Sequence, residues 1–430
     1  MKSTTRKILK VAVLLVLSLV ALLLSAMVYL VSINSQKISF NDSNLTYTHP
    51  DISVESNAFY TLLNATNELY WPRGKERELD NLISNTNWDD SLALEILQKN
   101  RASLNSFDKA MQQPFLLVPE LQNFDDDDPQ YLGAWRNLAF IESIQINSLH
   151  RTRADKEAMV LAFEVINFGQ RVENSGGPIL YYLVGEGTKA RGFWHIQKMI
   201  PDINLDEADL KEAIRKLNDY GPNKEGITNA LRVEYRMQKN SIDDSAEGIM
   251  PGQTNAVHAR SLGSKLVFNP DKTKWEFAEC DESVLNNFSK PFSEATSTNI
   301  ANIEFVTNAP VPERLIKGNA VGDILVLMAE PMLQAVIQRK SKEDVNVRAT
   351  QILLALKVYK MQHGRLPDSL SELVPEFFPQ VPLDDFDGKP FHYSPDKKII
   401  YSVGPCLKDL DGTERKNYSA DYNLPFKIEF

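Results

Sequence analysis

Cysteine is nearly absent from this sequence: the 430 residues include two, Cys280 and Cys406. Two cysteines are too few for a disulfide framework or a cysteine-rich zinc site. The sequence is compatible with one disulfide between them and equally with two separate thiols. Cysteine usage therefore excludes a small disulfide-stapled domain and gives no indication of a metal centre.

Recognisable catalytic motifs are also missing. The histidines show neither HExxH nor another paired spacing; they stand at positions 49, 150, 195, 258, 363 and 392. No convergent acid, base and nucleophile set is visible. The stretch Gly185-Glu-Gly187-Thr-Lys-Ala190 formally matches a dinucleotide-binding fingerprint but lacks the preceding strand that this motif needs. The sequence predicts a protein that is not an enzyme and has no organic cofactor.

Positive charge is in deficit. Lys and Arg total 47 against 57 Asp and Glu, so the formal net charge is -10. Phosphate recognition needs a basic surface, and this balance argues against a nucleic-acid partner.

One long hydrophobic run stands near the N-terminus. Residues 11–31 carry no charge and, as a helix, would reach roughly 32 Å, enough to cross the hydrocarbon core of a bilayer. Lys2, Arg6, Lys7 and Lys10 flank it on the N-terminal side alone, which predicts a cytoplasmic tail at 1–10 and export of the rest.

The alternative for this run is a cleaved signal peptide. Its apolar region would be about 7–15 residues long and would precede a small-x-small cleavage site, which is not clear here. We therefore predict an uncleaved transmembrane helix at 11–31, in the inner (cytoplasmic) membrane, with the C-terminal bulk in the periplasm. The polar, unpatterned residues 32–50 read as a tether.

Residues 51–300 are predicted to form a helical domain. Ala58, Leu62 and Ala65 have helical spacing, and residues 131–174 read as two antiparallel helices joined near Arg151 to Asp155. Successive helix pairs of similar length suggest solenoid-like packing, which commonly offers a surface to another macromolecule.

The segment around Asn269 can be read as a hairpin or as a helix. Asn269 as N-cap, Pro270 at the first helical position and Asp271 in the first turn favour the helix. Its core face would carry Trp275, Ala278, Leu285 and Phe288. Residues 290–311, rich in Ser, Thr, Asn and Pro, are the predicted boundary between the helical domain and a unit at 301–430.

That second unit is predicted to be α+β. Ile324 to Gln362 has the pattern of a long helix, perturbed at Pro331, and Gly364 fits the position that ends it. Ser369-Leu-Ser-Glu372 is a capping box for a short helix. The runs "PFHYS" and "KIIYSVG" then indicate strands after about residue 388. The fold class is therefore mainly α, ending in a long helix on a short antiparallel sheet.

The stretch "ALKVYKMQHGRLPDSLSELVPEF", followed by "PLDDFDGKPFHY" and "IIYSVGPCLKDLDG", resembles the C-terminal part of the major pseudopilin of type II secretion. The layout as a whole resembles uncharacterised single-span bacterial envelope proteins. The resemblance implies that Leu356 and Tyr359 pack beneath strands around Tyr393 and Tyr401. It does not imply pilus assembly, because the pseudopilin processing site and the glutamate of its first helix are missing.

The pseudopilin acidic loop binds calcium, so the corresponding loop is a candidate metal site. Asp409 and Asp411 are carboxylates at alternate positions before a glycine, and Asp421 could return as a third. The residue after Gly-Pro is Cys406, a poor calcium ligand, and a solvated turn is the alternative reading.

Three functions follow from these observations. The first is a membrane-anchored, non-enzymatic envelope protein that serves as a scaffold or binds a protein partner. The second is a carbohydrate- or peptide-binding protein that uses an aromatic groove between helices. The third is a hydrolase without a recognisable motif.

Overall fold

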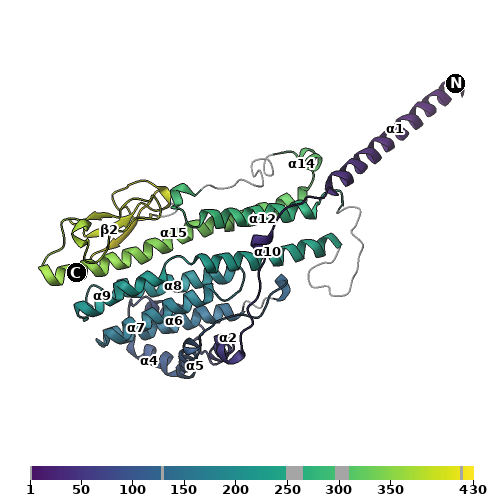
Figure 1. The fold of residues 1–430 in the computed structure, drawn as a ribbon. Coiled ribbons are helices and arrows are strands. Elements are labelled where there is room, and N and C mark those ends of the chain that lie inside the picture. Colours follow the sequence, from purple (N-terminus) through teal and green to yellow (C-terminus); the bar gives the residue numbers. More distant parts are fainter. Residues whose placement is uncertain (1, 127–129, 248–264, 296–308, 417–419) are drawn as a thin grey trace.

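The computed structural model describes residues 2–126, 130–247, 265–295, 309–416 and 420–430. It is mainly helical, and the helix at the N-terminus projects away from a layered body (Figure 1). The helices are α1 (Lys2–Asn34), α2 (Ala58–Asn67), α3 (Glu76–Ile83), α4 (Asp90–Lys99), α5 (Arg101–Gln112), α6 (Gln130–Arg151), α7 (Asp155–Glu173), α8 (Ile179–Met199), α9 (Glu207–Lys216), α10 (Lys224–Glu247), α12 (Pro270–Asn287), α14 (Val311–Lys317) and α15 (Ala320–His363). The strands are β1 (His392–Ser394), β2 (Ile399–Ser402) and β3 (Leu424–Lys427).

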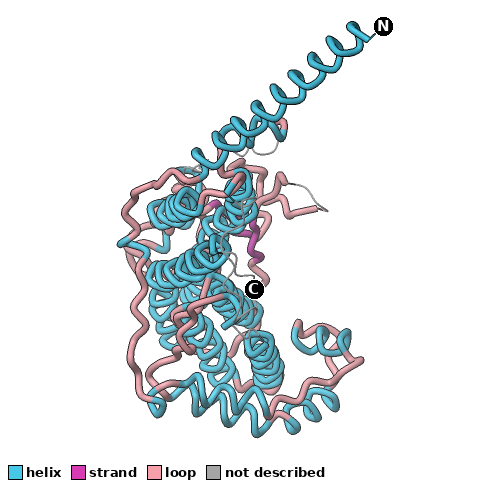
Figure 2. The backbone as a smooth tube through the Cα atoms, turned by 90° about the vertical axis from the view of Figure 1, so that its right-hand side faces the viewer, coloured by secondary structure: helices cyan, strands magenta, loops and turns pink. Residues whose placement is uncertain are grey.

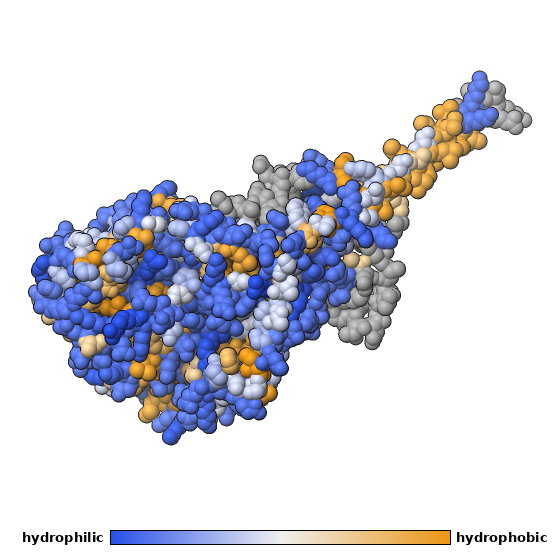
Figure 3. Space-filling view, in the orientation of Figure 1, coloured by the Kyte–Doolittle hydropathy of each residue, from blue (hydrophilic) through white to orange (hydrophobic). Residues whose placement is uncertain are grey.

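Helix α1 is the apolar helix that the sequence predicts. Within the described ranges it alone is long and apolar enough to cross a membrane, over Leu9–Asn34. Its most apolar stretch is not buried against the body, and the helix leaves the body at one end, where its last turns contact α14 (Figures 1 and 2). The space-filling view shows this helix as a hydrophobic rod on a largely hydrophilic molecule (Figure 3).

The predicted helix pairs are present. Helices α6 and α7 form the hairpin with its turn between Arg151 and Asp155, and α8 packs closely along α7. Two glycines permit that close approach: a Cβ on Gly185 would lie 2.5 Å from the carbonyl oxygen of Gly169, and the converse holds for Gly169. The glycines of the apparent dinucleotide motif therefore lie inside a helix, where Gly185 serves helix packing.

The segment around Asn269 is a helix, as predicted. The Asn269 side chain accepts a hydrogen bond from the Lys272 N–H at 3.1 Å, and Pro270 begins α12. Ala278 and Phe288 are buried on the core face, while Trp275 is half-buried. Of the predicted boundary at 290–311, residues 296–308 lie outside the described residues.

Helix α15 runs the length of the body and joins it to the C-terminal module (Figure 1). It ends at Gly364, whose φ of 73° is the left-handed conformation expected there. The Ser369–Glu372 capping box is present on a short 3₁₀ turn. The three strands follow residue 388, as predicted, and form an antiparallel sheet in the order β1-β2-β3, with Tyr393 opposite Ile400.

One hydrophobic core extends from the helical body into this module. The cluster that contains Ile166 and Phe193 of the helical body also contains Leu356 of α15 and Ile400 of β2. Tyr359 belongs to the same cluster, and the half-buried residue Tyr393 packs against it. Leu356 and Tyr359 therefore share a core with β2 and contact the Tyr393 region as expected, while Tyr401 is not part of this cluster.

Candidate functional site: a cleft between the helical body and the C-terminal sheet

A cleft of about 660 Å³ lies where the C-terminal sheet meets the helical body. It is lined by the end of α8, the middle of α15 and the chain that runs through β3. Ligand pockets commonly measure roughly 300–1,000 Å³, so this cleft has the size of a binding site. Because its walls come from three parts of the chain distant in sequence, no local pattern could have predicted it.

Aromatic rings from two elements, α8 and β3, line the cleft. Trp194 of α8 and Phe426 of β3 are both half-buried, so each ring keeps an exposed portion that a ligand can cover. Tyr422 lies deeper, with the Arg415 guanidinium 5.1 Å from the centre of its ring. Such rings offer large contact areas with few torsions to order.

The charge of the cleft is opposite to that of the chain. Its lining holds four cations and two carboxylates, a difference of two positive charges; these residues are Lys198, Lys342, Arg415, Lys427, Glu414 and Glu429. Lys427 and Glu414 form an ion pair at 3.5 Å, and among these six described residues Lys198, Lys342 and Arg415 form none of comparable length. A cationic cleft on a protein of net charge -10 favours an anionic ligand.

Strand β3 is an edge of the sheet, and its sequence discourages addition of another strand. Pro425 has no N–H to donate, and Lys427 places a charge on the same short strand. Both are features that natural edge strands use against pairing. A ligand in this cleft would therefore be held by side chains rather than by a fourth strand.

The cleft lies far from α1. Asn346 and Leu353 of its α15 wall lie about 40 and 50 Å along the helix from Ala320, at about 1.5 Å per residue. Helix α15 thus holds the cleft at the end of the body opposite α1.

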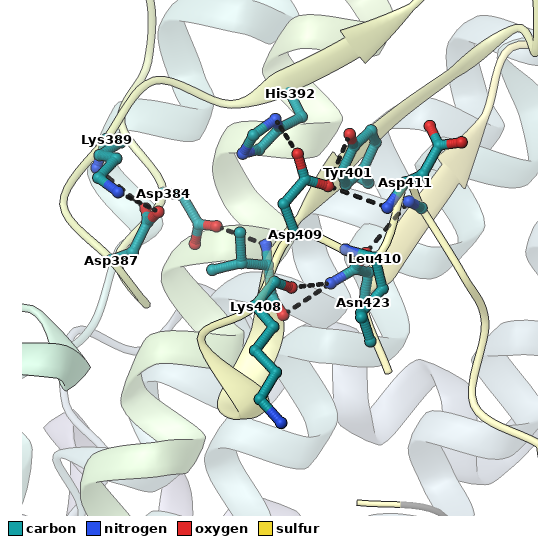
Figure 4. Close-up of polar contacts among 12 residues, drawn as sticks. Asp384, Asp387, Lys389, His392, Tyr401, Lys408, Asp409, Leu410, Asp411 and Asn423 are labelled. Atoms are coloured by element: carbon teal, nitrogen blue, oxygen red, sulfur yellow. Dashed lines mark hydrogen bonds and ion pairs between the residues drawn. The ribbon is translucent and has the colours of Figure 1, made fainter. Parts of the chain in front are cut away.

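The predicted calcium ligand Asp409 points back towards the sheet (Figure 4). It accepts hydrogen bonds from the Tyr401 hydroxyl at 3.1 Å and from the Asp411 N–H at 2.9 Å, and lies 3.6 Å from His392 Nδ1. The backbone hydrogen bond, with Tyr401 and His392, lowers the pKa of Asp409 although slight burial opposes this.

The other two predicted ligands each lie beside a lysine. Asp411 pairs with Lys397, and Asp421 lies 3.1 Å from Lys408. In the part of the chain that the structure describes, no three acidic, histidine or cysteine side chains converge to hold a metal ion. Calcium binding by Asp409, Asp411 and Asp421 stays a prediction.

Asn423 organises the acidic loop, although no sequence pattern marks this residue. Its side-chain oxygen accepts from the N–H groups of Leu410 and Gly412 at 2.9 and 3.1 Å. Its amide nitrogen donates to the carbonyl oxygens of Val403 and Lys408 at 2.9 and 2.8 Å (Figure 4). One neutral side chain thereby satisfies four backbone groups of the acidic loop.

A second cluster that sequence reasoning missed lies inside the helical body. Lys189 of α8 donates to Glu173 of α7 at 2.9 Å and to the Gly221 carbonyl at 3.2 Å, and it pairs with Glu343 of α15. The charged side chains are at most 1% exposed. A lysine inside the apolar pattern of α8 is the signal that could have drawn attention to this position.

Burial governs the ionisation of this cluster. It raises the pKa of Glu173 to about 7 despite the opposing influence of Lys189, and raises that of Glu343 well above its usual range. For Lys189, burial favours the neutral form, but Glu343 and Glu173 outweigh it and the pKa rises. Two carboxylates share one cation in a place that no ligand reaches, so the cluster affects stability rather than binding.

Of two buried histidines in the helical body, His150 has acidic partners, whereas neither ring nitrogen of His195 has a hydrogen-bond partner among the described residues. His150 bridges Asp155 at 2.6 Å and Asp202 at 3.1 Å, which ties the α6–α7 turn to the chain after α8. His195 is enclosed, and burial, with the neighbouring Arg191, lowers its pKa to about 3. His258 lies outside the described residues.

Neither Cys280 nor Cys406, both in the described part of the chain, forms a disulfide. Cys280 is buried in α12, and the Cys406 thiol donates to the Tyr422 carbonyl at 3.1 Å. Cys406 therefore helps to hold the wall of the cleft as a thiol.

No family model, curated protein or solved structure matches this chain.

Proposed function

We propose that the protein is a non-enzymatic, membrane-anchored binding protein of the bacterial envelope. In this account α1 is a single-pass anchor in the inner membrane, residues 1–10 are cytoplasmic, and the body lies in the periplasm. The solenoid-like helical domain and the pseudopilin-like C-terminal module together present the cleft to a protein partner.

Contacts at the end of α1 support retention of the anchor. The Asn34 side chain accepts a hydrogen bond from the Asn319 N–H at 2.6 Å and donates to the Leu266 carbonyl at 2.9 Å. Asn34 is 1% exposed, so its contacts belong to the interior of the body. A leader that is removed after export would leave the buried Asn319 N–H without this acceptor.

The binding proposal depends on one observation: the cleft combines aromatic rings from α8 and β3 with a surplus of cations. This combination suits an extended protein segment that carries carboxylates, because rings cover its apolar side chains while Lys198 and Lys342 meet its charges. The partner is therefore proposed to be another envelope protein with an acidic segment, and not a nucleic acid.

Photo-crosslinking in intact cells tests this proposal. Benzoylphenylalanine at Phe426, inside the cleft, should capture a protein, whereas the same probe at Leu94, 58% exposed on α4, should not capture that protein. Lys198→Glu with Lys342→Glu should abolish the Phe426 adduct while the protein level stays unchanged. Identical adducts at both positions, or none at Phe426, would refute the cleft as the binding site.

Carbohydrate binding is the second candidate, favoured by the half-buried Trp194 and Phe426 rings. A sugar face can stack on such a ring, and the cations would then select an acidic glycan. A Phe426 adduct that resists protease but is shortened by glycan hydrolysis would support this alternative.

A further inference from the structure

An exposed apolar surface lies at the end of the body from which α1 emerges. It is formed by α14 and the first turn of α15, where Val311 is 58% exposed, Ile316 57% and Val321 41%. Hydrophobic residues are visible where α14 meets the base of α1 (Figures 1 and 3). Large apolar side chains grouped in the open indicate a contact surface. We call Val311, Ile316 and Val321 the interfacial patch.

The level of this patch along α1 can be worked out from the helix rise. From Val11, the first residue of the uncharged run, to Tyr29 is about 27 Å at about 1.5 Å per residue, close to the roughly 30 Å thickness of the hydrocarbon core. The Tyr29 hydroxyl donates to the Ile316 carbonyl oxygen at 3.1 Å. Tyrosine is enriched where a membrane helix enters the headgroups. Helix α14 therefore lies beside α1 at the depth where the bilayer surface would be.

The patch cannot swing away from that depth without breaking buried contacts. Gly318, with φ 77°, ends α14 against the Ile33 side chain, which a Cβ would approach to 3.2 Å. The next residue, Asn319, is completely buried and bonded to Asn34. The chain on both sides of the α14–α15 corner is thus fixed to the last turns of α1.

We propose that the interfacial patch is a membrane-surface contact: Val311, Ile316 and Val321 insert into the headgroup–acyl boundary of the bilayer that α1 spans. This rests on the proposed insertion of α1. Lipid is favoured over a second copy of the chain because the patch is continuous with α1 and fixed at the level of Tyr29. Interfacial segments of this kind bury their apolar side about 5–10 Å into the boundary. The contact would fix the tilt of the body, and with it the height at which α15 holds the cleft.

The test is depth-dependent fluorescence quenching of the full chain in lipid nanodiscs. Single labels are placed at Ile316→Cys, Val20→Cys and Leu94→Cys in a background of Cys280→Ala with Cys406→Ser. All three label positions are at least 45% exposed, so the labels displace no core side chain. Spin-labelled lipids carry the quencher either near the headgroup or deep in the acyl chain.

The expected pattern separates the three positions. The Ile316 label should lose most of its fluorescence with the shallow quencher, the Val20 label with the deep one, and the Leu94 label with neither. Deep quenching at Val20 with none at Ile316 would overturn the patch and leave the anchor standing. No quenching at Val20 would remove the anchor itself, and with it the proposed function. If the Ile316 label is less quenched by lipid when each disc holds more chains, the patch contacts a second copy of the chain. That result would overturn the proposal.

Discussion

Two polar junctions of helix α15 hold their charges at different depths. At its start, the Asn319 N–H donates to Asn34, and its side-chain oxygen accepts from the Asn269 N–H at 2.9 Å. The Asn319 amide nitrogen also donates to Glu276 and Asp323, both at 3.2 Å, and these carboxylates share Lys272, whose side chain is 28% exposed. In the middle of α15, Glu343 and Glu173 share Lys189, and all three side chains are at most 1% exposed.

The direct link between α1 and α15 joins the Asn319 N–H to the Asn34 amide oxygen, and these groups do not titrate over the physiological range. The charges beside this link do titrate, because burial, with Asp323, raises the pKa of Glu276 to about 7. Buried carboxylates with raised pKa do titrate, so the packing of α7, α8 and α15 should respond to pH. The following changes should break or sharpen this contrast.

The largest effect is expected from Lys189→Met. It removes the cation and leaves Glu173 and Glu343 buried without it, and breaking a buried ion pair in this way typically costs about 3–5 kcal/mol. Chemical denaturation of the full chain in detergent would measure the loss in the free energy of unfolding.

A triple variant is the matched control for this prediction. Lys189→Met with Glu173→Gln and Glu343→Gln keeps the volumes and removes all three charges, so most of the lost stability should return. A triple variant as unstable as the single one would show that shape, and not charge, makes this cluster important.

At the start of α15, Asn34→Ala should destabilise the folded protein by about 1–3 kcal/mol, because the Asn319 N–H is left buried without its acceptor. Asn34→Asp keeps the accepting oxygen but buries a carboxylate against the Leu266 carbonyl oxygen, so it should cost more at pH 7 than at pH 5. Thermal melts in nanodiscs at the two pH values would compare the variants, and the pH dependence of the Asn34→Asp loss should exceed that of the Asn34→Ala loss.

The pH response of the cluster formed by Lys189, Glu173 and Glu343 has a definite sign. The folded-state pKa of Glu173, about 7, lies above its ordinary value of 4.5, so between these values the folded state binds more protons than the unfolded state. The free energy of unfolding therefore falls as pH rises from about 4.5 through 7, by at most about 1.4 kcal/mol per pH unit for one proton. Glu343 and Glu186 face the same site and share in this response, because burial raises the pKa of each above its usual value. Lys189 and Tyr182 also face the site, but their raised pKa values keep both protonated over this range.

Glu173→Gln should flatten this slope, because Lys189 then has one carboxylate partner, Glu343. Denaturation curves at pH 5, 6 and 7 for both proteins would test it. A slope unchanged by the substitution would assign the pH response to other buried acids, such as Glu142 or Asp281, whose pKa values burial also raises.

The smallest effect is expected at the acidic loop. A calcium ion there would have to displace Lys397 from Asp411 and Lys408 from Asp421, so its stabilisation of the folded state should be modest. Millimolar calcium should raise the Tm of the wild-type full chain slightly relative to chelator, and should not raise that of Asp409→Ala with Asp411→Ala. Identical melts for the wild type in both conditions would leave Asn423 as the organiser of the loop and exclude the predicted site.

What the sequence could predict was local. The Asn269 cap, the glycine at 364 and the Ser369–Glu372 box each act within a few residues, and each is where the pattern placed it. The uncharged run of α1 is equally local.

What it could not predict joins residues far apart in the chain. The cluster joins Lys189 to Glu343, the Asn423 amide reaches back to Val403, and the cleft combines Trp194 with Phe426. Neither spacing nor periodicity encodes such pairs. Residues 32–50 are predicted to be a polar tether. In the structure, Leu45 of this segment is buried against α10 and α12, and Asp42 pairs with Lys239, contacts that the local pattern does not indicate.

The central claim is that α1 is a permanent part of the folded protein, joined to α15 through Asn34 and Asn319. Mass spectrometry of the mature protein, purified from the cell envelope, tests this most directly. The account predicts that the mature chain begins before residue 11, so that Tyr29 and Asn34 are both retained in it. A mature protein whose first residue lies beyond Asn34 would contradict it, because the amide that holds the start of α15 would then have left with a cleaved leader.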